Sequence, residues 1–355
     1  MVYILAAIII FGVLIAVHEW GHYIAARLCG VTVHEFAIGM GPKLYHKEKN
    51  GCLYTLRLLP IGGYCALEGE EEESDDPHSL NNQNLFKKIV IFAAGAFMNF
   101  VAGLVIILIL FANAGGFYTA EVTGVREDFA YGGETGIQVG DVIYRIDGHR
   151  IYNRSDVELF LGRGDGQGYS IEVMRDGKRI DVGYIPLTEY TEEDGTTVQA
   201  IGITIGGVEK ATLGAKLRYS WYQAIDFVRL VWISLGDLLS GAVGMEQLSG
   251  PVGIVDALSE VGSDPELSPT VWDALWNIGY FAALIAVNLA VMNLLPIPAL
   301  DGCKILFLLV NGLTMLLFKR QIPPKYENYI HAAGFVLLMG LMVVATFQDV
   351  WRIIK

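Results

Sequence analysis

Two histidines and a glutamate lie within five residues of the first apolar segment, in the order His18-Glu19-Trp20-Gly21-His22. Residues four apart lie on one face of an α-helix, about one turn apart, so the two histidines can bind one metal ion together. The glutamate between them lies near such a metal and can take a proton from a water molecule there. The spacing therefore predicts a zinc-dependent hydrolytic site.

The apolar setting of this HExxH motif adds weight to the prediction. Ionisable side chains inside a bilayer are energetically costly and usually mark a functional site. The alternative is a polar cluster at the point where the helix leaves the membrane, with neutral, locally hydrogen-bonded histidines. Seventeen residues precede His18. At 1.5 Å per residue they extend about 25 Å, so the motif lies toward the far end of the span.

A hydrolytic zinc site usually takes three protein ligands, so one more must come from elsewhere in the chain. The best candidate is Asp301, in the segment Asn293-Leu294-Leu295-Pro296-Ile297-Pro298-Ala299-Leu300-Asp301-Gly302. Two prolines break a helix here and free backbone groups that protein or water must satisfy. We expect an unwound segment near the depth of the histidines. A simple helix cap at the membrane exit is the alternative for Asp301.

Long apolar runs place these residues in a membrane protein. The chain has 355 residues, 53% of them hydrophobic, which is too apolar for an ordinary soluble protein of this length. Four runs reach the roughly 20 residues that a helix needs to cross a bilayer. We expect a polytopic α-helical membrane protein with about four transmembrane helices, at residues 1–30, 89–114, 276–304 and 328–348. The first run lacks the basic start and cleavage site of a signal peptide, so we interpret it as a retained span.

The net charge of −13 is unevenly distributed. Residues 115–275 contain 12 Lys and Arg against 25 Asp and Glu, so this segment carries the whole net charge. Two shorter loops hold basic residues, namely Lys43, Lys47, Lys49, Arg57, Lys87 and Lys88 in one and Lys304, Lys319, Arg320 and Lys325 in the other. Lys and Arg concentrate in cytoplasmic loops, so we expect these loops inside, and the acidic segment and both termini outside. The charge balance gives no indication of nucleic-acid binding.

The hydrophilic segments predict β structure and one amphipathic helix. In the loop 31–88, strands are expected at 31–38, 53–59 and 64–67, forming a small cytoplasmic-side β-hairpin insertion. The segment 117–207 reads as an external β-rich domain, with hairpin turns at Asp147-Gly148 and Asp176-Gly177. Within 212–275, residues 219–241 predict an amphipathic helix at the membrane surface or against the spans. The acidic run after the first sheet, residues 70–76, reads as a solvated connection.

Several of these motifs together resemble the site-2 protease family of intramembrane metalloproteases, over essentially the whole chain. An HExxH motif in the first span and an N-x-x-P-x-P-x-L-D-G segment in a later one form a specific pair. Phe36-Ala37-Ile38-Gly39-Met40-Gly41-Pro42-Lys43-Leu44 and Arg57-Leu58-Leu59-Pro60-Ile61-Gly62-Gly63-Tyr64 look like two further stretches of that family. Gly250-Pro251-Val252-Gly253-Ile254 is similar to its G-P-V-G-I element.

The resemblance implies a role for each matching residue. His18, His22 and Asp301 would bind a single Zn²⁺, and Glu19 would be the general base. Asn293 would hydrogen bond the substrate backbone. The strand Leu53-Tyr54-Thr55-Leu56-Arg57-Leu58-Leu59 would add its edge to the substrate. Strand pairing suits this chemistry because a transmembrane helix shields its own peptide bonds and must unwind to be cleaved.

The external domain resembles a PDZ domain through Thr135-Gly136-Ile137-Gln138-Val139-Gly140-Asp141-Val142-Ile143. A generic β-domain without a peptide-binding groove is the alternative. The resemblance implies a multi-pass protein of a bacterial plasma membrane with its active site toward the cytoplasm. Its substrates would be single-span membrane proteins, such as anti-sigma factors or remnant signal peptides, trimmed first by another protease. The lipid bilayer and a peptide ligand of the PDZ-like domain would be further partners.

The chain departs from the family at several positions. Gly302-Cys303-Lys304 stands where G-G-H is usual, which brings a thiol close to the site as packing or as a redox-sensitive group. The second span has Ala96 in place of a proline but keeps Asn99, which would brace the site or form an interhelical hydrogen bond. Gly132-Gly133-Glu134 replaces P-A-x beside the PDZ-like groove. His331 is expected to be interfacial or structural.

Two other functions remain open on sequence alone. One is a membrane scaffold without activity, whose PDZ-like domain recruits partners; the intact HExxH motif and Asp301 oppose it. The other is a metal transporter, which needs ionisable residues distributed through several spans. Here those residues cluster at one end of the spans.

Overall fold

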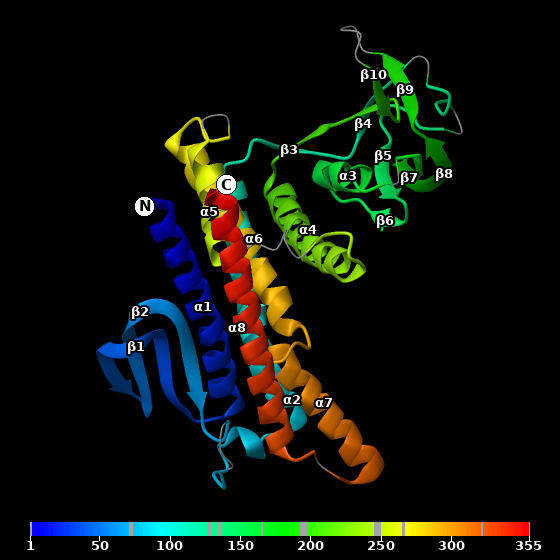
Figure 1. Cartoon of the computed structure of the whole chain (residues 1–355). Coiled ribbons are helices and arrows are strands. Elements are labelled where there is room, and N and C mark those ends of the chain that lie inside the picture. The colour runs from blue at the N-terminus through cyan, green and yellow to red at the C-terminus, as the bar shows by residue number, and fades with distance from the viewer. Residues whose placement is uncertain are drawn as a thin grey trace. The chain divides into compact units, whose positions relative to one another are not determined.

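Figure 1 shows the computed structural model, which describes residues 2–70, 74–126, 129–133, 136–164, 166–191, 197–244, 250–264, 267–320 and 322–354. The acidic residues 71–73 and the PDZ-like positions Glu134 and Thr135 lie outside the described residues. The chain forms two compact units. Met1–Leu110 with Phe227–Lys355 make one, called here the helical unit. Phe111–Asp226 make the other, the β-rich unit.

Five helices of the helical unit are long and apolar enough to cross a membrane. They are α1 (Val2–Cys29), α2 (Leu85–Phe111), α6 (Val271–Leu294), α7 (Asp301–Phe318) and α8 (Pro324–Ile354). The predicted class, a polytopic α-helical membrane protein with two β-rich insertions, is confirmed. Each of the four predicted spans lies largely in α1, α2, α6 or α8.

Helix α7 corrects the prediction of a short loop between the last two spans. After Asp301 and Lys304 the sequence is apolar through Phe318, so it continues as a helix once the two prolines are passed. In Figure 1, α7 carries on beyond the end of α6, and α8 returns alongside them. The two chain ends consequently lie at the same end of the helical unit.

The insertion between α1 and α2 is a small sheet built from two long strands, β1 (Val33–Lys49) and β2 (Cys52–Leu67). Asn50 and Gly51 connect them with φ angles of 54° and 73°, as a tight turn of primed type requires. The first part of β1 pairs with both ends of β2, so that Ile38 faces Gly63 on one side and Leu56 on the other. The strands expected at 31–38, 53–59 and 64–67 are therefore confirmed as parts of one sheet.

A hydrophobic core joins this sheet to the two helices that carry the HExxH motif and its neighbours. It contains residues from the end of α1, both strands and the start of α2: Ala25, Ala26, Val31, Val33, Cys52, Leu67, Leu80, Ile91 and Phe92. Burial of this apolar surface holds the sheet next to the part of α1 that carries His18 and His22.

A buried carboxylate docks the G-P-V-G-I element. Helix α5 (Pro251–Ser263) begins at this element, and the backbone N–H groups of Gly250 and Gly253 donate to Oδ2 of Asp349, at 2.9 and 2.8 Å. Asp349 lies near the end of α8 and is 2% exposed. It satisfies N–H groups that the first turn of a helix leaves without intrahelical partners. The contact therefore ties α5 to the last transmembrane helix.

Before α4, the β-rich unit contains ten strands and one short helix among its described residues. They are β3 (Gly116–Tyr118), β4 (Val122–Val125), β5 (Val142–Ile146), β6 (His149–Arg150), α3 (Arg154–Leu161), β7 (Gly168–Arg175), β8 (Lys178–Pro186), β9 (Thr188–Thr191), β10 (Thr197–Ala200), β11 (Ile203–Ile205) and β12 (Val208–Lys210). The largest sheet has the order β6-β5-β7-β8. The hairpins predicted at Asp147-Gly148 and Asp176-Gly177 connect β5 to β6 and β7 to β8.

The predicted amphipathic helix is present as α4 (Leu213–Ser240). The polar side chains in the first half of α4 are buried rather than solvated, since Gln223 and Asp226 are 8% and 5% exposed, whereas Ser240 at its end is exposed. Trp221 and Trp232 are about half exposed, at 48% and 55%. Exposed tryptophans are the side chains that favour a membrane–water interface.

We predict that Asp349→Ala destabilises the detergent-solubilised protein by about 1–3 kcal/mol, because two buried N–H groups lose their acceptor. A fall in the thermal denaturation midpoint measures the effect. Asp256→Ala is the matched control, since Asp256 is an exposed carboxylate of α5. Equal midpoints for the two variants would contradict the docking role of Asp349.

Candidate metal centre

The three predicted metal ligands meet at one point. His18 and His22 come from α1, and Asp301 is the first residue of α7. Oδ2 of Asp301 lies 3.1 Å from Nε2 of His18 and 3.3 Å from Nε2 of His22. The two Nε2 atoms are 3.2 Å apart. The structure thus brings together two nitrogens and one carboxylate oxygen from segments almost 280 residues apart in sequence.

The donor set fits zinc in both chemistry and spacing. Two imidazoles and one carboxylate are a ligand set of hydrolytic zinc sites, with a fourth position left for water or substrate. Donors that lie 2.0–2.1 Å from a tetrahedral zinc are roughly 3.3 Å from one another. The three observed separations of 3.1, 3.2 and 3.3 Å match that value.

A backbone carbonyl of α2 orients His22. Nδ1 of His22 lies 2.8 Å from the carbonyl oxygen of Ile91, so Nδ1 carries the proton and donates it. Nε2 is then unprotonated and available to a metal, the arrangement common to metal-binding histidines. His22 is 8% exposed, which keeps this hydrogen bond away from competing water.

Asn99 of α2 contacts the other histidine. Its amide nitrogen lies 3.4 Å from Nδ1 of His18, and its Oδ1 is buried without a hydrogen-bond partner. A half-turn of the amide exchanges the two atoms, so that Oδ1 accepts a proton from Nδ1 of His18. That hydrogen bond leaves Nε2 of His18 free for the metal. The contact favours the bracing role over an ordinary interhelical hydrogen bond.

Gly95 is a site residue that the sequence analysis did not single out. A Cβ atom on Gly95 would lie 2.4 Å from Nε2 of His22 and 2.8 Å from Nε2 of His18. Gly21, which directly precedes His22 in α1, makes a similar approach, because a Cβ there would lie 2.4 Å from the carbonyl oxygen of Ala94 in α2. Only glycine permits this separation of the two helices. A glycine inside an apolar helix is the signal that could have identified both positions.

The break between α6 and α7 positions Asp301. Helix α6 ends at Leu294, and the prolines separate it from α7. Ala299 has a φ of 76°, which is sparsely populated for a residue with a Cβ, and its N–H donates to Nδ1 of His331 at 3.1 Å. His331, on α8, thus has the structural role predicted for it, because it holds the turn that precedes the aspartate.

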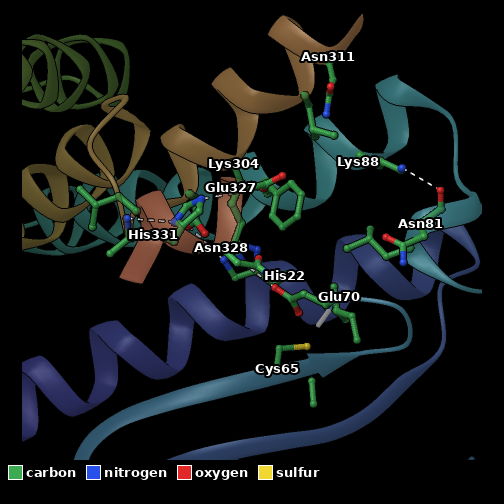
Figure 2. Close-up of a pocket in the computed structure, with 18 of the residues that line it drawn as sticks. His22, Cys65, Glu70, Asn81, Lys88, Lys304, Asn311, Glu327, Asn328 and His331 are labelled. Atoms are coloured by element: carbon green, nitrogen blue, oxygen red, sulfur yellow. Dashed lines mark hydrogen bonds and ion pairs between the residues drawn. The ribbon is translucent and has the colours of Figure 1, made fainter. Parts of the chain in front are cut away.

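A large cavity opens at the metal centre (Figure 2). Its volume is about 1450 Å³. His18, Glu19, His22 and Asp301 line it, and Asn293 lines it too, as the predicted substrate role requires. The side chain of Asn293 has no hydrogen-bond partner among the described residues. The last residues of β2 form another part of the wall: Tyr64, Cys65, Ala66 and Leu67.

The prediction that the strand Leu53–Leu59 offers a free edge is wrong for its first part, Leu53–Leu56. These residues pair with Glu35–Ile38 on one side and with Tyr45–Glu48 on the other. A strand that is paired on both sides has no unpaired N–H and C=O groups to offer a substrate. None of the residues from Leu53 to Leu59 lines the cavity. The segment Tyr64–Leu67 has a recorded partner only in the first part of β1.

Two of the residues expected to bind substrate instead hold the sheet together. Thr55 and Arg57 donate to Oε1 of Glu35, at 2.7 and 2.9 Å. Burial of Glu35 opposes its ionisation, but the hydrogen bonds from Thr55, Arg57 and Tyr64 outweigh it and lower the pKa of the carboxyl to about 2. Glu35 therefore stays ionised and links two neighbouring strands.

The departures from the family pattern after Asp301 have different environments. Cys303 is 3% exposed and does not line the cavity, which fits a packing role. Lys304 does line the cavity, and its Nζ lies 2.6 Å from Oε1 of Glu70.

Comparison with known proteins agrees with the site. The sequence model of peptidase family M50 matches residues 6–341. A Clostridium perfringens protein, named as a candidate zinc metalloprotease, is 36% identical over 349 residues, covering 98% of both chains. Zinc metalloprotease RasP of Oceanobacillus iheyensis is 30% identical, covering 99% of this chain and all of the relative. Regulator of sigma-W protease RasP of Bacillus subtilis is 26% identical, covering 99% and 98%.

Helices apolar enough to cross a membrane and a zinc-binding HExxH site define the class of intramembrane zinc metalloproteases. The chain belongs to peptidase family M50, the site-2 protease family. It is a multi-pass membrane protein, and the predicted enzyme class and zinc cofactor are confirmed.

We predict that Gly95→Ala abolishes zinc retention, because the added methyl group would occupy the space of both histidine Nε2 atoms. Metal analysis of the purified protein measures the loss directly. Gly340→Ala is the control, since a Cβ at that position in α8 meets open space. Full zinc content in Gly95→Ala would contradict the close approach of α1 and α2.

Proposed function

We propose that the protein hydrolyses peptide bonds of single-span membrane proteins near the cytoplasmic face of a bacterial plasma membrane. The observation that carries this proposal is the gathering of a zinc ligand set, a carboxylate and an unpartnered amide in one cavity. His18, His22 and Asp301 are the proposed ligands. Glu19 is the proposed base, and Asn293 the proposed contact to the substrate.

The chain's own side chains supply the proton transfer. Zinc, when bound, acts as a Lewis acid on the scissile carbonyl. Glu19 lies between the two histidines in sequence and lines the same cavity, so it can take a proton from the attacking water. The resulting carboxylic acid can then protonate the leaving amine. Family membership supports this assignment, because zinc metalloproteases with HExxH use the glutamate in this way.

The substrate needs help to expose its peptide bond, because a transmembrane helix shields its own backbone groups. We place the substrate beside Tyr64–Leu67 rather than beside Leu53–Leu59. The first of these segments lines the cavity and has one recorded partner strand, which leaves its other edge for an added strand. The amide of Asn293 can hydrogen bond the extended backbone from the opposite wall.

The substrate class follows from the relatives and from the domain organisation. One relative is named regulator of sigma-W protease RasP, and this name supports anti-sigma factors as substrates. Remnant signal peptides are a second group of single-span substrates. The β-rich unit, with its PDZ-like sequence, is proposed to act outside the membrane as a binding domain or size filter, so that an earlier protease must trim the substrate.

The proposed orientation places the sheet of β1 and β2 in the cytoplasm and the β-rich unit outside, following the distribution of Lys and Arg. Helices α6 and α7, separated only by the proline-containing turn, would make one interrupted crossing. That arrangement supports an even number of crossings, with both chain ends outside.

We predict that Glu19→Gln lowers cleavage of a single-span reporter protein by at least about 10²-fold, because general-base catalysis is lost. Appearance of the cleaved product in proteoliposomes measures the rate. The variant keeps its ligands and should retain zinc, which metal analysis checks. Equal cleavage by both proteins would exclude a reaction that depends on Glu19, and no cleavage above background by either would favour an inactive scaffold.

Removal of zinc with a chelator should stop cleavage by the wild type, and added zinc should restore it, because the reaction needs the metal as a Lewis acid on the scissile carbonyl. The same proteoliposomes can test for metal uptake. Zinc accumulation inside them with no cleavage of the reporter would favour a transporter instead.

Cross-linking can locate the substrate strand. In a Glu19→Gln protein whose other cysteines are replaced, Cys65 is expected to cross-link to a cysteine near the scissile bond of the reporter. The matched protein carries Thr55→Cys as its only cysteine and should cross-link much less, because its strand is paired on both sides. Preferential cross-linking at position 55 would restore the Leu53–Leu59 strand as the binding edge.

A further inference from the structure

An ion pair spans the active-site cavity. Nζ of Lys304 donates to Oε1 of Glu70 at 2.6 Å. Lys304 lies one helical turn after Asp301 on α7, and Glu70 lies three residues after the end of β2. The pair therefore connects the helix that begins with the third metal ligand to the segment that follows the proposed substrate-binding strand. Figure 2 shows the two residues on different walls of the cavity.

The surroundings favour a defined contact rather than a loose surface pair. The side chains of Lys304 and Glu70 are only 31% and 25% exposed. Nζ of Lys304 also lies 5.0 Å from the centre of the Phe92 ring, within the range of a cation–π interaction. An ion pair with restricted access to water is screened less than an exposed one. The ion pair between Lys304 and Glu70 is thus partly shielded from water where it lines the cavity.

We propose that the Glu70–Lys304 ion pair is a positioning device, which holds the substrate-binding strand Tyr64–Leu67 at a fixed distance from the metal ligand Asp301. This inference rests on the proposed proteolytic function. The hydrophobic core anchors the β1–β2 sheet to α1 and α2. Asp301 comes from α7, beyond the proline-containing turn, so a separate contact must set its distance from the strand.

The distance matters because the peptide bond must meet the metal and Glu19 at the same time. A misplacement of about 1 Å in such a site can lower the rate of the chemical step by about 10²-fold. Breaking the pair would let the strand and Asp301 move relative to each other. Substrate would still pair with the strand, but its scissile bond would be poorly aligned.

The test measures kcat and KM for the single-span reporter in proteoliposomes. Lys304→Met and Glu70→Gln should each lower kcat by roughly 10- to 100-fold with little change in KM. The double variant should lose no more kcat than the less active of the two single variants, because both substitutions remove the same ion pair. The exchanged pair, Glu70→Lys with Lys304→Glu, should recover most of the lost rate, as should the conservative Lys304→Arg.

Two further variants control for the charge of the cavity. Lys88→Met and Asp75→Asn remove the same charges from residues that line the same cavity but do not join its two walls. They should keep kcat near the wild-type value. Equal losses in these controls, or no recovery in the exchanged pair and Lys304→Arg, would overturn the positioning role. A loss of zinc or of thermal stability in parallel with kcat would overturn it too.

The outcome can be separated from failure of the proteolytic function. The proteolytic reaction is established first, by showing that the wild type cleaves the reporter and that Glu19→Gln does not. If the wild type cleaves and the two single variants cleave equally well, the positioning role alone is wrong. If the wild type does not cleave the reporter, the proposed function fails before the pair is tested.

Discussion

The mutual approach of three metal-binding side chains is the constraint on which the helical unit depends. Two imidazole nitrogens and a carboxylate oxygen lie within 3.3 Å of one another, among helices apolar enough for a bilayer. A partly buried carboxylate such as Asp301 is costly without a compensating positive charge, which a zinc ion would supply. The positions of α1, α2 and the start of α7 all follow from this requirement.

Neighbouring helices contribute contacts that hold this arrangement in place. Helix α2 approaches α1 through Gly95 and supplies the carbonyl of Ile91 and the amide of Asn99 to the histidines. Helix α8 supplies His331, which holds the turn before Asp301. The contacts of Ile91 and Asn99 with the two Nδ1 atoms fix Nε2 as the ring nitrogen that faces the metal. A membrane span that carries HExxH therefore needs a partner helix as much as a third ligand.

Hydrolysis inside a membrane also needs an unfolded stretch of substrate, and we propose the last segment of the β1–β2 sheet as the place for it. Its last segment lines the cavity, while its central segments are committed to neighbouring strands and to the hydrogen bonds of Glu35. The sheet is thus both a structural base packed on α1 and α2 and the wall along which an extended chain can lie. The link from Glu70 to Lys304 joins that wall to the metal side.

The sequence by itself determined four of the five candidate spans among the described residues, the histidine pair with its glutamate and the candidate third ligand, because helical spacing and apolar run length are local properties. It also determined the hairpin turns at Asp147-Gly148 and Asp176-Gly177. Tertiary structure alone decided which strand edge is free, because pairing on both sides of Leu53–Leu56 depends on how two long strands fold over each other. It alone decided the role of Gly95, because an absent Cβ matters only where another helix comes close.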